Sequence, residues 1–298
     1  MKLRDIYAHP GHTFSFEFFP PRTDEGMDTL FAELQTLKAL DPAFCSVTYG
    51  AGGSTQDQTV EIVRRVRSEA GLETMCHLTI VNQPKAQVRR VLAQLREAGI
   101  ENIIALAGDP PDGVEVDWTP HREGFLHSRE LVEEALAVDD GWFSVAVAGF
   151  PEVHPRAVSR ESDLDYLKAK IDAGACAVVT QLFFDNEDYF RFVEDLRALG
   201  VEVPIVPGLM PVLSSPQIRR FTKMCHSKIP PPLEERLVAV GDDNEAATEM
   251  GIEYACEQVR GLLEFGIPGI HFYSLNRSRS VKAIFENCGL QELQTAVR

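Results

Sequence analysis

The sequence lacks a CxxC pair, a low-complexity tract and any apolar run long enough to span a bilayer. Its six cysteines are scattered, so neither a zinc site nor a catalytic thiol has supporting spacing. We expect these cysteines to be small buried hydrophobic residues in a reducing compartment. Residues 1–14 lack the apolar core of a signal peptide, and we therefore expect a cytoplasmic protein.

Basic charge is also scarce. The chain has 29 Lys and Arg against 45 Asp and Glu, giving a net charge of −16, which argues against nucleic acid or a membrane surface as partners. A local pocket can still bind an anionic small molecule. The 298 residues, 44% hydrophobic, suffice for one large domain or two ordinary ones. Because no linker is evident, we expect a single catalytic domain over residues 1–298.

Short apolar, β-branched runs alternate with amphipathic segments from one end of the chain to the other. Strands are expected at residues 13–18, 44–48, 73–80, 102–107, 143–148, 177–182, 204–207 and 269–273. Helices are expected at residues 26–39, 56–70, 84–98, 127–138, 160–173, 186–199, 215–226, 244–265 and 278–288. The proline-rich segment 228–237 is interpreted as an insertion. This alternation fits a doubly wound sheet or a (β/α)8 TIM barrel with extra helices, and the lack of a glycine-rich dinucleotide fingerprint favours the barrel.

The stretch "FSFEFFPPR" places one carboxylate among phenylalanines at the end of the first expected strand. Alternation puts Phe14, Phe16 and Phe18 on one face and Glu17 on the other. Burying an unpaired carboxylate is unfavourable, and a proton held near neutral pH relieves that penalty. Glu17 is therefore predicted to be either a structural ion-pair partner or an acid.

Polar residues also follow the other expected strands, at the barrel end where such enzymes carry their chemistry. Each has a structural alternative: His77 as a core histidine, Asp109 as a turn former and Gln181 as a buried amide. No lysine projects from an expected strand, which argues against a Schiff-base aldolase. No early strand carries paired histidines, which argues against a metallohydrolase, and we expect no metal.

Eight motifs occur in order from about residue 13 to residue 290: "FSFEFFPPR", "SVTYGAGG", "HLT", "GDPP", "FPEVHP", "DAGACAVVTQLFFD", "PIVPGLMPV" and "HFYSLNRS". Together they resemble the methylenetetrahydrofolate reductases of the short bacterial type. The resemblance implies a (β/α)8 barrel that uses FAD and NADH or NADPH. It also implies reduction of methylenetetrahydrofolate to methyltetrahydrofolate, in the methionine branch of one-carbon metabolism.

The same resemblance assigns roles residue by residue. Glu17 matches the general acid that protonates the departing amine nitrogen of the substrate ring, and Asp109 matches a catalytic residue that holds the pterin near the flavin. Gln181 matches an amide that contacts folate and nicotinamide in turn. Further folate contacts match Gln217, Phe221 and Arg277. Cofactor contacts match Thr48, Tyr49, Ala51, His77, Ala107, Gly108, Asp109, His127, Phe150, His154, Asp163, Lys170 and Gln181.

The sequence departs from the family pattern where the cofactor is expected. Ala107 and Ala169 stand where arginines are usual, and His127 stands where tyrosine is common. Each lost cation would weaken pyrophosphate binding by ~1.5–3 kcal/mol, and Lys168, Lys170, Arg156 or Arg160 are candidates to compensate. Two alternatives remain: a flavin-free variant with direct hydride transfer from nicotinamide to folate, and a non-catalytic folate-binding barrel. The choice between NADH and NADPH, and whether the chain forms a homo-oligomer, stay open.

Overall fold

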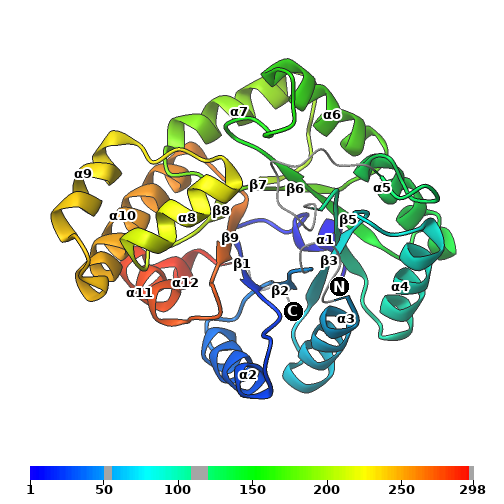
Figure 1. The fold of residues 1–298 in the computed structure, drawn as a ribbon, viewed down its shortest axis with the longest axis horizontal. Helices are drawn as coiled ribbons and strands as arrows, with labels where there is room; N and C mark the ends of the chain where they lie inside the picture. Colours follow the sequence, from blue (N-terminus) through cyan, green and yellow to red (C-terminus); the bar gives the residue numbers. More distant parts are fainter. Residues whose placement is uncertain (50–55, 109–119, 295–298) are drawn as a thin grey trace.

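A computed structural model describes residues 1–49, 56–108 and 120–294, and within them parallel strands form a nearly closed barrel surrounded by helices (Figure 1). The strands are β1 (Thr13–Phe18), β2 (Phe44–Val47), β3 (Thr74–Thr79), β4 (Asn102–Leu106), β5 (Ser144–Gly149), β6 (Ala177–Thr180), β7 (Ile205–Val206), β8 (Gly208–Leu209) and β9 (Gly269–Tyr273). They are hydrogen-bonded in the order β7-β6-β5-β4-β3-β2-β1-β9-β8. The expected (β/α)8 TIM barrel is confirmed.

The helices pack outside the sheet, except for α1. They are α1 (Leu3–Ile6), α2 (Asp24–Lys38), α3 (Gln56–Arg65) continued by a π-helical turn (Val66–Ala70), α4 (Lys85–Glu97), α5 (Ser128–Leu136) with a 3₁₀ turn (Val138–Asp140), α6 (Arg160–Asp172), α7 (Asn186–Ala198), α8 (Ser215–Cys225), α9 (Pro231–Val240), α10 (Asn244–Phe265), α11 (Arg279–Cys288) and α12 (Leu290–Leu293). No helix in these described parts of the chain is long and apolar enough to cross a membrane.

The barrel closes through a seventh strand that is divided into β7 and β8 at Pro207. β7 pairs with β6, where Val178 lies opposite Ile205, whereas β8 pairs with β9, where Gly208 lies opposite His271. Proline has no N–H to donate to a ladder, but its carbonyl accepts from the backbone N–H of His271 at 3.0 Å. The two ends of the sheet are thus consecutive pieces of one segment.

Most elements follow local sequence signals. β1 and β9 have the predicted bounds. The helix α4 buries its stripe of Val88, Val91, Leu92 and Leu95 completely, and it ends just before Gly99, whose φ of 73° suits glycine.

The segment 228–237, interpreted as an insertion, contains a helix that was not expected from the sequence, because α9 begins at Pro231. Pro230 is the residue just before this helix, and two further prolines occupy its first turn. The N–H groups of that turn have no partner within a helix, so proline is tolerated there and the run of prolines starts a helix. The short helices α1 and α12 were also not expected from the sequence.

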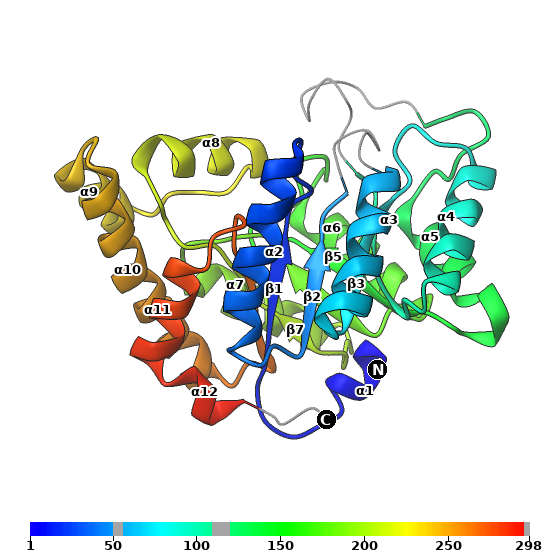
Figure 2. The same cartoon turned by 90° about the horizontal axis from the view of Figure 1, so that it is seen from below.

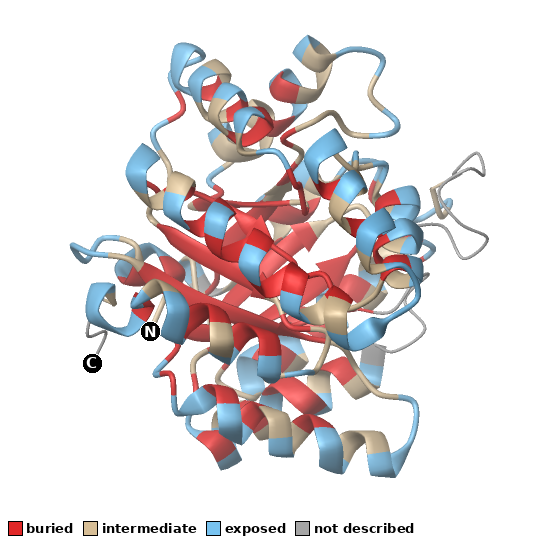
Figure 3. Cartoon of the chain, turned by 90° about the vertical axis from the view of Figure 1, so that its left-hand side faces the viewer, coloured by how far each residue is buried: buried red, intermediate tan, exposed pale blue. Residues whose placement is uncertain are grey.

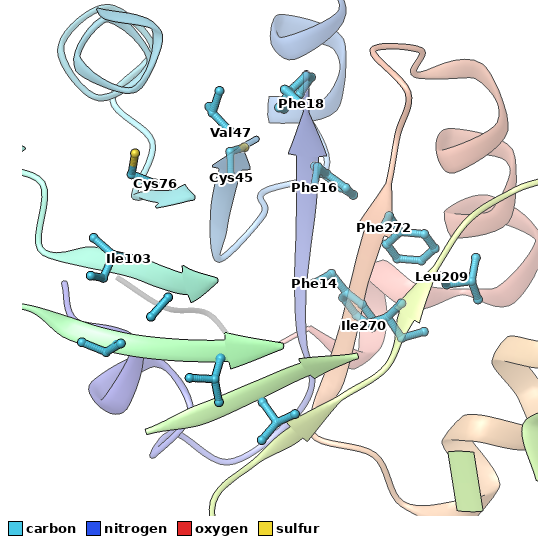
Figure 4. Close-up of a cluster of buried hydrophobic side chains, with 14 of the residues drawn as sticks. Phe14, Phe16, Phe18, Cys45, Val47, Cys76, Ile103, Leu209, Ile270 and Phe272 are labelled. Atoms are coloured by element: carbon cyan, nitrogen blue, oxygen red, sulfur yellow. The ribbon is translucent and has the colours of Figure 1, made fainter. Parts of the chain in front are cut away.

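Two groups of apolar side chains pack against the strands, one outside the barrel and one inside its amino-terminal end. Polar side chains therefore occupy the interior at the carboxyl ends of the strands. Phe14, Phe16 and Phe18 point outward into the core under the helices (Figure 4). The strands of the barrel are buried along most of their length (Figure 3). At the amino-terminal end, the interior is filled by Phe44, Met75 and neighbours, with α1 packed beneath them (Figure 2). The opposite end of the interior holds Glu17.

Candidate functional site

Glu17 lies near the carboxyl end of β1, between Ser46 of β2 and Tyr273 of β9 in the sheet register. Its side chain is 5% exposed and faces two imidazoles. Its Oε2 is 3.1 Å from Nε2 of His77 and 3.5 Å from Nε2 of His271. The carboxylate is therefore a partnered group in a buried polar cluster.

The two histidines decide the protonation state of Glu17. Burial by itself would raise its pKa, but the charge of His77 and hydrogen bonds from His271 and His77 lower it from 4.5 to about 2. Of the two roles predicted for Glu17, the ion-pair partner matches this arrangement, because the two imidazoles favour the ionised carboxylate.

His271 is a central residue of this cluster that sequence reasoning missed. It is fully buried, and its Nδ1 lies 2.7 Å from the hydroxyl of Ser15, while its Nε2 lies 3.2 Å from that of Ser46. Its ring stacks on Phe44, with centroids 5.9 Å apart. One signal pointed to it: His271 precedes Tyr273 by two residues in a strand, so both face the barrel interior.

A second group forms after β5 and on α6. Asp163 accepts a hydrogen bond from the backbone N–H of His154 at 2.8 Å, and the ring of His154 packs against Phe150 with centroids 4.5 Å apart. Lys170 donates to the carbonyl of Ala148 at 2.8 Å. Burial lowers the pKa of His154 to about 4 and that of Lys170 to about 8. The structure thus brings together four residues that were predicted to contact the cofactor, namely Phe150, His154, Asp163 and Lys170.

The structure also separates the cations proposed to replace the missing arginines. Lys168 pairs with Asp172 at 2.7 Å, away from the cluster of Lys170. Arg160 pairs with Asp195 at 2.8 Å and donates to two loop carbonyls, although its Nη2 is buried without a partner in the described chain. Besides burial, the charges of Arg156 and Lys170 lower the pKa of His154, which places these two candidate cations beside the predicted cofactor residues.

A third group follows β9 and starts α8. Gln217 and Arg277 line a hollow of about 820 Å³. Phe221 is half-buried on the same helix as Gln217. The loop of Arg277 is held by Asn276, whose side chain pairs with both backbone groups of Phe19 at 2.8 Å. This loop is thereby joined to the residue that follows β1.

The remaining predicted residues lie at or just after strand ends. Thr48 and Tyr49 follow β2, and Thr48 donates its backbone N–H to Phe18 at 2.9 Å. The amide oxygen of Gln181 accepts from the next backbone N–H at 2.8 Å.

Three further predicted positions lie after β4 or just before α5. Ala107 and Gly108 follow β4, and a side chain at Gly108 would collide with Thr79. His127 precedes α5, with its ring 5.8 Å from that of Tyr166. Ala51 and Asp109 lie outside the described residues. Among the residues that the structure describes, no group of His, Cys, Asp or Glu could hold a metal ion.

Comparison with known proteins gives consistent matches over most of the chain. The family model described as "Methylenetetrahydrofolate reductase" matches residues 2–289. A protein of Escherichia coli named "5,10-methylenetetrahydrofolate reductase" is 37% identical over 277 residues, which cover 93% of this chain and 90% of that protein. "Methylenetetrahydrofolate reductase (NADH) 1" of Arabidopsis thaliana is 39% identical over 298 residues.

The matches differ in how much of each relative they cover. The match includes 97% of this chain but only 50% of the Arabidopsis protein, so the chain spans about half the length of that relative. Among solved structures, an uncharacterized protein from Clostridium thermocellum that binds two copies of 5-methyl-5,6,7,8-tetrahydrofolic acid aligns with a TM-score of 0.65. It covers 99% of this chain and all of that chain, but at 14% identity it supports the fold alone.

Proposed function

Because the chain belongs to the methylenetetrahydrofolate reductase family, we propose that it reduces methylenetetrahydrofolate to methyltetrahydrofolate with hydride from a reduced nicotinamide. Residues 1–298 act as one catalytic barrel domain in the cytoplasm, and the product enters the methionine branch of one-carbon metabolism. The names of the plant relatives include NADH, which favours NADH as the nicotinamide. The observation that carries the proposal is the buried carboxylate of Glu17 beside two imidazoles.

The chemical task of Glu17 is to protonate the amine nitrogen of the five-membered substrate ring as that ring opens. The resulting iminium carbon is the electrophile that accepts hydride. Since the pKa of Glu17 is about 2, the carboxyl must gain a proton before it can act. His77 is the neighbour through which that proton arrives, because its Nε2 lies 3.1 Å from Oε2. A substrate covering the site would exclude water and favour the neutral carboxyl.

The group around Lys170 fits the diphosphate of FAD. Lys170 is a half-buried cation, and the carboxylate of Asp163 is its main charged neighbour. An anionic diphosphate would stabilise its charged form. His154 and Phe150 provide an adjoining aromatic surface, and the left-handed Gly108 lets the backbone approach a ligand closely. When bound, FAD would carry hydride from the nicotinamide to the folate.

The third group fits the anionic end of a folate. Arg277 provides a cation in a protein of net charge −16, and Gln217 provides an amide on the same hollow. Phe221 provides an apolar ring for the aromatic part of the substrate. Asp109 and Gln181 complete the proposed pterin contacts.

The Glu17→Gln variant tests the proposal, because it keeps the shape of the side chain and removes its acid. We expect the variant to bind folate and to accept electrons from NADH, yet to form methyltetrahydrofolate at least about 100-fold more slowly. Glu17→Asp should recover part of that rate. Full turnover by Glu17→Gln would refute the acid role.

The visible spectrum of the purified protein separates the proposal from its alternatives. A flavin spectrum that NADH bleaches under anaerobic conditions supports the relay through FAD. A colourless protein that still makes product would favour direct hydride transfer. A protein that binds folate without turnover would be a binding barrel, for which the acid at Glu17 has no use.

A further inference from the structure

Glu152, in the loop after β5, belongs to none of the three groups described above, yet its carboxylate is largely buried. Its side chain is 12% exposed, and its two carboxylate oxygens accept from the backbone N–H of Lys228 at 3.0 and 3.1 Å. Lys228 belongs to the turn of residues 226–230, which connects α8 to α9. The contact therefore joins the loop after β5 to the end of α8.

The turn after α8 is held at a second point. His226 ends the helix in the left-handed conformation, with a φ of 55°, and the N–H of Ser227 donates to the carbonyl of Thr222 at 2.9 Å. The hydroxyl of Ser227 donates to the carbonyl of Leu182, the residue after Gln181, at 2.9 Å. The end of α8 is thus fastened to the segments that follow both β5 and β6.

The backbone around Glu152 is itself fixed. Arg160, at the start of α6, donates to the carbonyl of Glu152 at 3.0 Å and to the preceding carbonyl at 3.1 Å. Asp163 accepts from the N–H of His154 at 2.8 Å. Phe150 and His154, the proposed FAD contacts of this loop, lie on either side of Glu152 in the sequence. Glu152 therefore connects the proposed cofactor loop to α8.

The main partner of Glu152 is the backbone of Lys228. The ammonium of Lys228 lies 3.7 Å from Oε2 of Glu152 and 3.5 Å from Oδ1 of Asp188, and its side chain is 67% exposed, so this ion pair is weak. Burial raises the pKa of Glu152, and the hydrogen bond from the backbone N–H of Lys228 is the largest effect that opposes it. Because a buried carboxylate without its donor is unfavourable, this contact favours one position of the turn.

The apolar contacts of α8 are confined to a small cluster separate from the main core. Ile218 packs there with Leu182 and Leu233, and Phe221 contacts the margin of the cluster. The helix lies near the top of Figure 2, the end of the barrel to which β1 runs. Apolar burial has no preferred direction, so the hydrogen bonds at the end of α8 decide where along this surface the helix lies.

We propose that Glu152 is a positioning residue that holds α8, and with it Gln217 and Phe221, at the distance from the cofactor loop that a bound folate requires. It acts through the backbone N–H of Lys228 and touches neither substrate nor cofactor. This inference rests on the proposed function, since it assumes that α8 contacts the folate. Without Glu152, the helix would have to be ordered when the folate binds, and that cost would weaken binding.

Kinetics of the whole reaction and of its first half separate positioning from a merely structural role. In Glu152→Ala, we expect the KM for methylenetetrahydrofolate to rise about tenfold with kcat changed less than about twofold, as for the loss of one charge-assisted hydrogen bond. The rate at which NADH reduces the flavin should stay within about twofold of the wild type, because α8 is assigned to the folate alone.

Three further variants identify the contact that matters. Glu152→Gln keeps the size and one oxygen acceptor, so its KM should rise only about threefold, and it provides the test if Glu152→Ala does not fold. Lys228→Ala removes the exposed ammonium but keeps the backbone N–H, and its KM should stay within about twofold of the wild type. Glu235→Gln, which removes an exposed carboxylate of α9, should match the wild type.

Hydrogen exchange measures the contact without turnover. In Glu152→Ala, the amides of residues 226–229 should exchange at least about tenfold faster than in the wild type, while those of α10 should change little. The inference would be overturned by an unchanged folate KM in a protein whose wild type turns over, by unchanged exchange at residues 226–229, or by exchange that rises over the whole barrel together with loss of FAD. A wild type that forms no methyltetrahydrofolate would instead refute the proposed function.

Discussion

At acid pH, the free energy of unfolding should depend on the ion cluster around Glu17. The pKa of this carboxyl is about 2 in the folded protein against an ordinary value of 4.5. The difference corresponds to about 3 kcal/mol of stability. Because the folded pKa is the lower one, this contribution is fully present above pH 4.5 and disappears as the pH falls through 2. Between pH 6 and pH 3, about 2 kcal/mol of it should be lost.

Urea unfolding at a series of pH values measures this quantity in the wild type and in Glu17→Gln. The free-energy difference between the two proteins should change by about 2 kcal/mol between pH 6 and pH 3, since the other carboxyls cancel. Glu25→Gln removes an exposed carboxyl of α2 and should give a curve parallel to the wild type. Parallel curves for Glu17→Gln as well would refute the assignment of a depressed pKa to Glu17.

Four further predictions concern cofactor, substrate and backbone. Lys170→Ala should weaken FAD binding by ~1.5–3 kcal/mol in a flavin fluorescence titration, whereas Lys168→Ala should not; equal effects would argue against the assignment to Lys170. In the wild type, flavin affinity should fall as the pH rises above about 8, where Lys170 loses its charge. Arg277→Ala should raise KM for the folate about tenfold with a smaller change in kcat, and an unchanged KM would remove this residue from the substrate site. Gly208→Ala should lower Tm markedly, because a Cβ there would lie 2.3 Å from the carbonyl oxygen of Thr180. Gly261→Ala meets only the flexible side chain of Asn186 and should have little effect, so similar melting of the two variants would contradict the tight packing at the divided strand.

The barrel could be predicted from the sequence because its signals are local. The alternation of Phe14, Phe16 and Phe18 fixes which face of β1 is apolar, and the helical stripe of α4 follows from the spacing of its aliphatic residues. Ordered motifs such as "FSFEFFPPR" sufficed to identify the family. The helix α9 was not expected from the sequence, because a run of prolines is compatible with a loop as well as with the first turn of a helix.

The partners of the buried groups were decided by the tertiary structure. Alternation shows that Glu17 faces inward, but only barrel closure brings His271 from the last strand beside it and thereby favours the ionised carboxylate. Periodicity along one segment determines which face is buried, whereas the contact across that face depends on the register of strands and helices distant in sequence.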